Sequence, residues 1–392
     1  MQALHFGAGN IGKGFIGYLL NKSGYEVCFV DVNQQLVDRL NQNNRYEVKL
    51  LDDNHTVETI SPVFALNGIT NQEEIINKIV DADIITTSVG VSNLDKIANI
   101  LAKGLLKRAR ENRKKVDVIA NENTINASSI LKKEIKKFLS DIEMNEICSF
   151  VGFPNSAVDR LALSEQGEDG ERTLVEPFYE WIINKSEMMN VDLPPIKDVI
   201  YVENLLPYIE RKLYIVNMGH AATAYIGFLS GENTIQSSLE NSKIEHFVRE
   251  TMNESAQYIL RKFDFQAQSM NDYIDKTLIR FKNKNISDHV SRVGRSPIRK
   301  LSFDDRLVKP TRELYEWGLS VEHLTTAIAA GFLFDHSQDE ESVIIQQYIK
   351  ENGIEKAIPH FTQIKNQKLI DKIKEKYDLL SNRDLVFIST KV

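Results

Sequence analysis

Residues 7–14 read GAGNIGKG, and this stretch decides the fold of the first half of the chain. It follows a short apolar stretch typical of a β-strand, QALHF, and it opens a helix-like stretch. Gly7, Gly9 and Gly12 form the pattern G-x-G-x-x-G. In this pattern the first glycine permits a tight turn, the second lets the backbone approach a pyrophosphate, and the third lets the helix pack closely on the strand. The helix N-terminus favours negative charge, so the loop is predicted to bind a dinucleotide through Gly7, Ala8, Gly9, Asn10, Ile11 and Gly12.

An acidic residue stands at the distance from the loop that dinucleotide binding requires. Asp31 ends the next strand-like stretch, about 20 residues beyond the loop, where a carboxylate accepts hydrogen bonds from ribose hydroxyls. A carboxylate there would repel a 2′-phosphate, so the sequence favours NAD over NADP. Ser88 and Val89 end another apolar stretch and are predicted to line the same crevice. The alternative is a structural glycine turn followed by an aspartate that caps a helix.

The order of the predicted elements gives the fold class. In the first half of the chain strand-like stretches alternate with helix-like ones, which indicates a parallel sheet covered on both faces. In the second half the alternation largely disappears, and stretches such as 241–263 carry apolar residues at helical spacing. Pro194 and Pro195 mark the boundary. The sequence therefore predicts an α/β fold, with an N-terminal Rossmann-type doubly wound sheet over 1–195 and a mostly α-helical C-terminal domain over 196–392.

The composition limits the class of protein. The 392 residues are 42% hydrophobic and 26% charged, which is ordinary for a soluble globular protein of about two domains. The formal net charge of −7 argues against a general nucleic-acid-binding protein. No uncharged stretch is long enough for a membrane span, and no basic segment precedes the first strand as in a signal peptide. A cytoplasmic protein without a nucleic-acid or membrane partner is therefore expected.

The two cysteines bear on redox chemistry and metal binding. Cys28 and Cys148 each lie in a strand-like stretch, VCFV and ICSFV, and are expected to be reduced thiols in a core. No group of cysteines and histidines has the spacing of a zinc site, so no metal is predicted.

Residues 211–221, RKLYIVNMGHA, place Lys212, Asn217 and His220 in an apolar, helix-like stretch. On an α-helix these three side chains fall within a sector of about 140° and can point into one cleft. Oxidation of an alcohol by NAD requires a base for the hydroxyl proton and donors for the developing alkoxide. A lysine in desolvated surroundings can be that base, and an asparagine amide can donate without changing charge. Singly, the three could be a solvated lysine, a local cap and a core histidine, but together they favour a catalytic set.

Several segments carry a resemblance to a known family. GAGNIGKGFIG, NENTIN, FPNSAVDR, EPFYEW, RKLYIVNMGHA and GRSPIRKLSFDDRL occur in the order found in the polyol-specific long-chain dehydrogenases, over nearly the whole chain. The resemblance implies a metal-independent NAD(H) enzyme in which Lys212 is the base and His220 contacts a substrate hydroxyl. It also implies that Asn123 and Asn217 stabilise the alkoxide. The positions that match the family's substrate contacts are Val158, Asp159, Arg292 and Lys300, with Arg160 as a neighbouring candidate that could instead pair with a carboxylate.

One position departs from a pattern that some members of this family share. Those members carry a glutamate three residues before the lysine, which acts as a proton channel. Ile209 occupies that place here and Glu210 follows it. The sequence leaves open whether Glu210 carries protons.

Residues 292–300, RVGRSPIRK, form a basic cluster in a chain that is acidic overall. Its four cations are Arg292, Arg295, Arg299 and Lys300. Arginine forks suit the oxygens of a phosphate, so Arg295 or Arg299 is the candidate for a phosphate contact. The alternative is a surface loop whose cations pair with acids such as Asp304 and Asp305.

The predicted reaction is reversible hydride transfer between NADH and the C2 carbonyl of fructose 6-phosphate. Two alternatives stay open. One is a related dehydrogenase for free mannitol or for a sugar acid such as fructuronate, because a carboxylate would also fit the basic cluster. The other is a non-catalytic NAD(H)-binding sensor. No heptad seam is present and related proteins often act as monomers, so a monomer is favoured and a dimer is left open.

Overall fold

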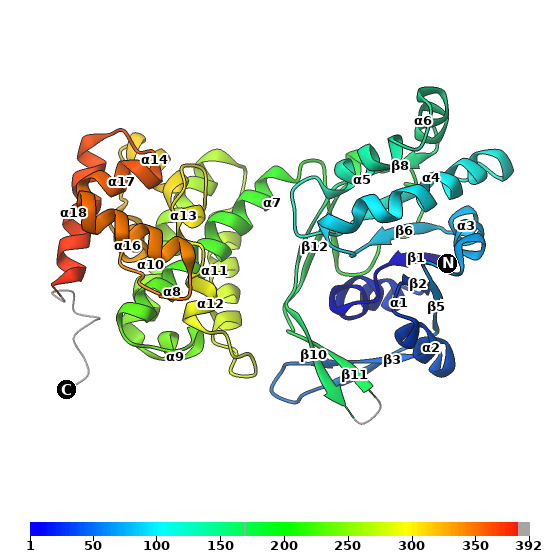
Figure 1. Ribbon diagram of the computed structural model, residues 1–392, viewed down its shortest axis with the longest axis horizontal. Helices are drawn as coiled ribbons and strands as arrows, with labels where there is room; N and C mark the ends of the chain where they lie inside the picture. Colours follow the sequence, from blue (N-terminus) through cyan, green and yellow to red (C-terminus); the bar gives the residue numbers. More distant parts are fainter. Residues whose placement is uncertain (168–169, 383–392) are drawn as a thin grey trace. The chain divides into compact units, whose positions relative to one another are not determined.

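The computed structural model describes residues 1–167 and 170–382 and divides into two compact units, Met1–Leu206 and Pro207–Val392 (Figure 1). The division falls at Leu206, whereas the sequence analysis placed it at Pro195. The reason lies in strand pairing, because β13 (Val199–Val202) pairs in parallel with β12 (Glu180–Asn184) and attaches the intervening residues to the first unit.

The first unit is built on a six-stranded parallel sheet with the order β5-β2-β1-β6-β7-β8. Its strands are β1 (Gln2–Phe6), β2 (Glu26–Asp31), β5 (Val63–Asn67), β6 (Ile84–Thr87), β7 (Val116–Ala120) and β8 (Val151–Gly152). The order reverses beside β1, as in a Rossmann-type doubly wound sheet, where ligands bind outside the carboxyl ends of the strands. The predicted fold class is confirmed.

Helices connect these strands. They are α1 (Tyr18–Lys22), α2 (Gln34–Asn43), α3 (Gln72–Asp81), α4 (Leu94–Glu111), α5 (Ala127–Lys136) and α6 (Asp141–Cys148). The helix predicted directly after the glycine loop begins as a π-helical turn, Gly12–Gly17, before it continues as α1.

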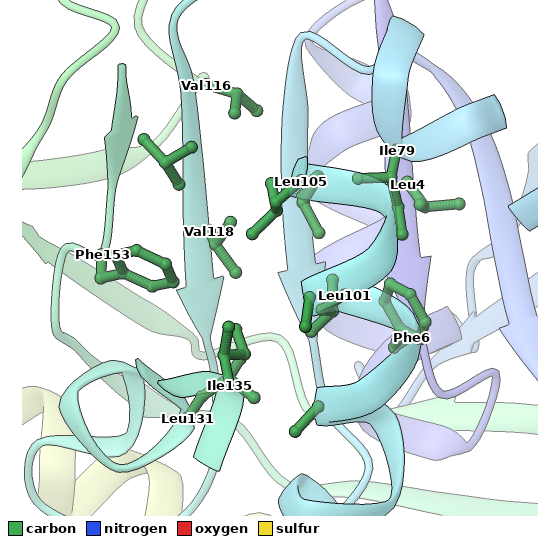
Figure 2. Packing of buried hydrophobic residues seen from close by; sticks show 14 of the residues in the cluster. Leu4, Phe6, Ile79, Leu101, Leu105, Val116, Val118, Leu131, Ile135 and Phe153 are labelled. Carbon is green, nitrogen blue, oxygen red and sulfur yellow. The ribbon is translucent and has the colours of Figure 1, made fainter. Parts of the chain in front are cut away.

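Both faces of the sheet are buried because successive strand residues point to opposite sides. On one face Leu4 and Phe6 of β1 join a core that includes Leu101 and Leu105 of α4 (Figure 2). On the other face the intervening strand residues pack against α1 and α2, as Ala3 does. Burying each large apolar side chain contributes about 1.5–3 kcal/mol, so these two layers hold the strand ends, and the loops that follow them, in fixed positions.

The strand predicted at Cys148 is wrong. Cys148 ends helix α6, and the strand β8 begins only at Val151. Helix α6 starts from a capping box in which the Ser140 side chain accepts from the backbone of Glu143 and the Glu143 side chain accepts in return, which fixes a helix through this apolar stretch. Cys28 is buried in β2 as predicted, and both cysteines are free thiols.

Two smaller sheets complete the first unit, in the orders β10-β11-β3-β4 and β13-β12-β9. The remaining strands are β3 (Tyr46–Leu50), β4 (Val57–Ile60), β9 (Ser156–Asp159), β10 (Ala162–Gly167) and β11 (Gly170–Val175).

The described part of the second unit is helical, as predicted. Its helices are α7 (Leu206–Arg211), α8 (Met218–Leu229), α9 (Ile235–Glu240), α10 (Ser242–Lys262), α11 (Ala267–Phe281), α12 (Val290–Gly294), α13 (Pro297–Lys300), α14 (Val308–Glu316), α15 (Glu322–Phe332), α16 (Glu340–Asn352), α17 (Ile354–Thr362) and α18 (Gln367–Ser381). Helix α8 is central and packs against α9, α10, α12 and α15. Within residues 1–167 and 170–382, no helix is both long and apolar enough to cross a membrane.

Candidate active site

The glycine loop has the geometry that its pattern predicts. Gly7 has φ of +100°, and a Cβ added there would lie 2.6 Å from the carbonyl oxygen of Ser88. A Cβ on Gly12 would lie 1.9 Å from the carbonyl oxygen of Gly7. Both positions therefore require glycine. Around Gly9, by contrast, an added Cβ would meet no atom within 4 Å, which leaves open space where a phosphate can approach the backbone.

Asp31 is held against this loop. Its Oδ2 accepts a hydrogen bond from the backbone N–H of Ala8 at 2.8 Å, and its Oδ1 accepts from the N–H of Asn33 at 2.9 Å. Helix α2 is capped by the side chain of Asn33, which accepts from Leu36, so Asp31 is not the helix cap. A carboxylate offers about four lone-pair sites and can accept from ribose hydroxyls in addition to these two donors. This arrangement fits the adenosine end of NAD.

A cavity of about 660 Å³ opens at the carboxyl ends of β1, β2 and β6. Gly7, Gly9, Asp31, Ser88 and Val89 line it, which brings five of the predicted cofactor residues to one place. The other lining residues were not predicted and are Phe6, Val30, Val32, Gly68, Ile69, Gln72, Asn93, Lys96, Ile97, Asn99, Ile100 and Lys103. The mixture of apolar walls and a glycine loop suits the apolar base and the charged pyrophosphate of a dinucleotide.

Glu122 positions the Ser88–Val89 segment, and sequence reasoning did not single it out. Its side chain is buried, with the residue 5% exposed. Oε1 accepts from the hydroxyl of Thr87 at 2.8 Å and from the N–H of Val89 at 3.0 Å, and Oε2 accepts from the N–H of Gly90 at 2.7 Å. Three donors on one turn thus converge on a single carboxylate. The available signal in the sequence was an acid two residues after the end of a buried strand.

His5 lies beneath the glycine loop and was also not predicted. Its Nδ1 is 2.7 Å from the hydroxyl oxygen of Thr86, and its Nε2 is 2.9 Å from that of Ser88. The side chain is fully buried, and this burial lowers the pKa of His5 to about 3. A neutral imidazole therefore joins β1 to the end of β6.

Asn123 follows β7, at the same edge of the sheet as the glycine loop, and its side chain is exposed. Its neighbour Asn121 is buried instead and accepts a hydrogen bond from the hydroxyl of Ser156 at 2.8 Å. Asn121 is thus anchored inside the first unit, whereas the side chain of Asn123 is exposed.

The predicted substrate residues of the first unit differ in their surroundings. Val158 and Asp159 end β9, with Val158 partly exposed and Asp159 buried. The guanidinium of Arg160 is buried and donates to the carbonyl of Gly14 at 2.9 Å and to that of Glu176 at 3.1 Å. Arg160 therefore binds backbone carbonyls within its own unit.

Lys212 and Asn217 lie at the two ends of a π-helical turn, Lys212–Asn217. The sequence analysis assumed an α-helix here, and that assumption is wrong. The backbone N–H of Met218 donates to the carbonyl of Leu213, five residues earlier. Because hydrogen bonds in a π-helical turn span five residues, the side chains of Lys212 and Asn217 point in more nearly the same direction than they would on an α-helix.

The residues of this segment differ in how far they are buried. Lys212, Asn217 and His220 are partly exposed, whereas Tyr214–Val216 and Met218 are buried. The three predicted catalytic side chains are therefore only partly enclosed, unlike most of the residues between them.

His220 is oriented by Asp288. Its Nε2 lies 3.0 Å from Oδ2 of Asp288, and its ring stacks on Phe281 with centroids 4.7 Å apart. Burial lowers the pKa of His220, although the hydrogen bond to Asp288 acts in the opposite direction. Oδ1 of Asp288 accepts from Nε of Arg292 at 2.7 Å. Arg292, a predicted substrate contact, thus shares the carboxylate that holds His220.

Glu210 is engaged in a buried cluster. Its carboxylate lies 2.9 Å from Nζ of Lys262 and accepts from the hydroxyl of Tyr258 at 3.0 Å. Nζ of Lys262 also donates to that hydroxyl at 2.7 Å. Glu210 is thus held by Lys262 and Tyr258 within the second unit.

Lys300 is turned inward from the basic cluster. It is 4% exposed, and its ammonium donates to the carbonyls of Val293 and Arg295. Burial lowers the pKa of Lys300 to about 7. The contacts indicate that Lys300 holds the loop after α12, and its predicted contact with the substrate stays a prediction.

Arg295 and Arg299 are the outward cations of the cluster. Both side chains are exposed, and neither guanidinium pairs with an acid among the residues that the structure describes. The acids that the sequence offered as partners are engaged elsewhere, Asp304 with Arg312 and Asp305 with Arg306. Two exposed arginines four residues apart fit an anion.

The predicted residues thus form two groups, one in each unit. The first holds the glycine loop, Asp31 and Asn123, and the second holds the lysine, asparagine and histidine with the basic cluster. Across the described ranges, no three His, Cys, Asp or Glu side chains are grouped as metal ligands would be.

Family models match both units of the chain. That of the mannitol dehydrogenase Rossmann domain matches residues 1–197, and that of the mannitol dehydrogenase C-terminal domain matches residues 204–381. The chain belongs to the mannitol dehydrogenase family. Membership confirms the predictions of an NAD-dependent oxidoreductase and of the polyol dehydrogenase family.

Curated members of the mannitol dehydrogenase family resemble the chain over nearly its full length. A mannitol-1-phosphate 5-dehydrogenase of Shouchella clausii is 42% identical over 372 residues, which cover 95% of this chain and 99% of that protein. One of Geobacillus stearothermophilus is 41% identical over 382 residues, which cover 97% of this chain and all of that protein.

Solved structures of mannitol and sorbitol dehydrogenases share the fold. A ternary complex of Pseudomonas fluorescens mannitol 2-dehydrogenase with NAD and D-mannitol has a TM-score of 0.70 at 17% identity, and covers 98% of this chain and 92% of its own. A substrate-free D-sorbitol dehydrogenase has a TM-score of 0.83 at 14% identity, and the match covers 97% of this chain and 93% of that protein. At these identities the likeness concerns the fold.

Proposed function

We propose that this enzyme interconverts D-mannitol 1-phosphate and D-fructose 6-phosphate reversibly with NAD as the redox partner. The observation that carries the proposal is the partial exposure of Lys212 and Asn217, at the two ends of the π-helical turn, and of His220, three residues further along in α8. The relatives named mannitol-1-phosphate 5-dehydrogenase, at about 42% identity over most of the chain, support this substrate.

Each polar group has a task in this proposal. NAD, when held by the glycine loop and Asp31, would supply the acceptor for the hydride of the alcohol carbon. Lys212 accepts the hydroxyl proton, and the amides of Asn123 and Asn217 donate hydrogen bonds to the developing alkoxide. His220 orients a neighbouring hydroxyl of the substrate, because Asp288 fixes the direction of its ring. Since lysine and amide groups supply the base and the donors, the reaction is proposed to need no metal ion.

The substrate phosphate is assigned to the outward arginines of the basic cluster. Arg295 and Arg299 are exposed and four residues apart, whereas Lys300 is buried under the same loop. Removing either guanidinium is expected to weaken binding of a phosphorylated sugar more than binding of a neutral one, since a hydrogen bond to a charged group contributes about 1.5–3 kcal/mol.

The decisive experiment follows NADH absorbance with fructose 6-phosphate, free fructose and fructuronate in parallel, all with EDTA present. Oxidation with fructose 6-phosphate alone is expected. Lys212→Ala should abolish turnover while NADH binding and the melting temperature persist, and the exposed Lys276→Ala is the matched control in the same unit.

The other outcomes separate the alternatives. Turnover with fructose would assign the enzyme to free polyols, and turnover with fructuronate would assign the arginines to a carboxylate. NADH binding without turnover of any of the three would favour a sensor. A Lys212→Ala protein with near-normal turnover would contradict the lysine mechanism.

A further inference from the structure

Ser255 makes a hydrogen bond that helical serines rarely make. It lies within α10, and its hydroxyl donates to the backbone carbonyl of Tyr214, in the π-helical turn, at 2.6 Å. Serine and threonine inside helices commonly bond the carbonyl four residues earlier in their own helix. Thr251, one turn before Ser255, does so by donating to Phe247 at 2.7 Å. Both residues are fully buried, so the difference lies in the partner and not in the surroundings.

The π-helical turn creates the acceptor for this bond. In an α-helix the carbonyl of Tyr214 would accept from the N–H of Met218. Here that N–H donates to Leu213 and Ile215 instead. A buried carbonyl that loses its helical donor needs another partner, because an unsatisfied buried acceptor costs about 1–3 kcal/mol. The hydroxyl of Ser255 supplies it.

The surrounding contacts hold the serine in register with the turn. Met252, Ser255 and Tyr258 are spaced three apart and lie on one face of α10. A Cβ added to Gly219 would lie 2.9 Å from the sulfur of Met252, so the two helices are in close contact there. The ring of Tyr258 meets that of Tyr214 edge to face, with centroids 5.3 Å apart. These contacts flank the hydrogen bond on both sides.

We infer that Ser255 is a positioning residue for the reaction, because its hydroxyl fixes the π-helical turn that aligns Lys212 with Asn217. This inference rests on the proposed function. Without the bond, the turn can relax toward an α-helix, in which residues five apart diverge by about 140°. Because the base and the alkoxide donor act on the same hydroxyl group, a small loss of alignment lowers turnover more than it lowers affinity.

The test compares Ser255→Ala with Thr251→Val, which removes an equally buried hydroxyl one turn away on the same helix. Hydrogen exchange of the backbone amides of 213–218 is measured without substrate, and kcat and KM are measured with fructose 6-phosphate. Ser255→Ala should speed the exchange about 3- to 10-fold. It should lower kcat about 10-fold or more and change KM less than about twofold. Thr251→Val should leave exchange in 213–218 and kcat close to the wild-type values.

The two readouts separate failure of the inference from failure of the proposed function. Unchanged exchange in Ser255→Ala would overturn the inference whether or not the enzyme turns over this sugar. Faster exchange with wild-type kcat would overturn the positioning role. If the wild-type enzyme turned over a different sugar, the same kcat comparison would be made with that sugar. Ser255→Cys, which keeps the size of the side chain and a weak donor, should give intermediate values if the hydrogen bond is the cause.

Discussion

The imidazole Nε2 of His220 lies 3.0 Å from Oδ2 of Asp288, while Oδ1 of the same carboxylate accepts from Arg292. Since a carboxylate only accepts hydrogen bonds, Nε2 carries the proton. Burial keeps the pKa of His220 below its usual value, so the ring is neutral near pH 7 and its Nδ1 retains a lone pair. A neutral ring of fixed tautomer can accept from a substrate hydroxyl.

Replacing Asp288 by asparagine should disturb this tautomer without removing much volume. An amide can present a donor to Nε2 and leaves Arg292 without its charged partner. Because a hydrogen bond to a charged group contributes about 1.5–3 kcal/mol, kcat/KM should fall about 10- to 100-fold. Steady-state kinetics measures this, with Asp275→Asn as a control that breaks an exposed ion pair with Arg249. Equal kcat/KM values for the two variants would contradict the orienting role of Asp288.

Asp31 should set both the affinity for NAD and the preference over NADP. Asp31→Ser removes the carboxylate that accepts from Ala8 and Asn33 at the rim of the cavity. The dissociation constant of NADH should rise about 10- to 100-fold, and that of NADPH should rise less because the repulsion is also removed. Fluorescence titration gives both constants. Asp38→Ser, at an exposed site on α2, is the control. An equal loss of affinity for NADH and NADPH in Asp31→Ser would count against a contact between Asp31 and the ribose.

Glu122 should stabilise the first unit through the Ser88–Val89 segment. In Glu122→Gln an amide replaces one of the oxygens that accept from Thr87, Val89 and Gly90. One of these donors is then left facing another donor in a buried place, which costs about 1–3 kcal/mol. Thermal unfolding should shift to lower temperature, and NADH should bind more weakly. Glu111→Gln, at the exposed end of α4, should change neither the unfolding temperature nor the affinity for NADH. A similarly small effect of Glu122→Gln would refute the anchoring role of Glu122.

The sequence was sufficient to predict the main fold and the residues that carry recognisable chemistry. The glycine loop and Asp31 obey constraints that act over a few residues, since a tight turn and a strand end fix them locally. The lysine, asparagine and histidine were visible because polar groups interrupt an apolar face. Cys148 was misplaced because a short apolar run suits a helix end as well as a strand, and the deciding capping box lies outside that run.

Other features of the site depend on contacts between segments far apart in the chain. The roles of Glu122 and Asp288 depend on their contacts with the Ser88–Val89 segment and with the ring of His220, which lie far away in the sequence. The inward turn of Lys300 follows from carbonyls presented by α12 and the residue after it. The π-helical turn could not be predicted from the sequence either, because one extra residue in a helical turn barely changes the spacing of the apolar residues. Its buried partner, Ser255, has no signal in the local sequence.

His5 should make the first unit sensitive to acid. The folded state holds the ring neutral because burial lowers the pKa of His5 to about 3, whereas the unfolded chain has a pKa near 6.5. Between these two values the unfolded state binds more protons, so stability rises with pH and is lost as pH falls from 6.5 toward 3. The free energy of unfolding should therefore fall by a few kcal/mol at most across this window, in addition to the contribution of other groups.

Denaturant unfolding of the first unit, monitored between pH 7.5 and about pH 4.5, tests this expectation. His5→Asn removes the titrating group and should flatten the dependence while it lowers stability at neutral pH, because the bonds to Thr86 and Ser88 are weakened. His55→Gln, at an exposed site in the same unit, should keep the wild-type slope. If His5→Asn and wild type lose stability in parallel on acidification, the acid sensitivity originates elsewhere and the buried ring plays no part in it.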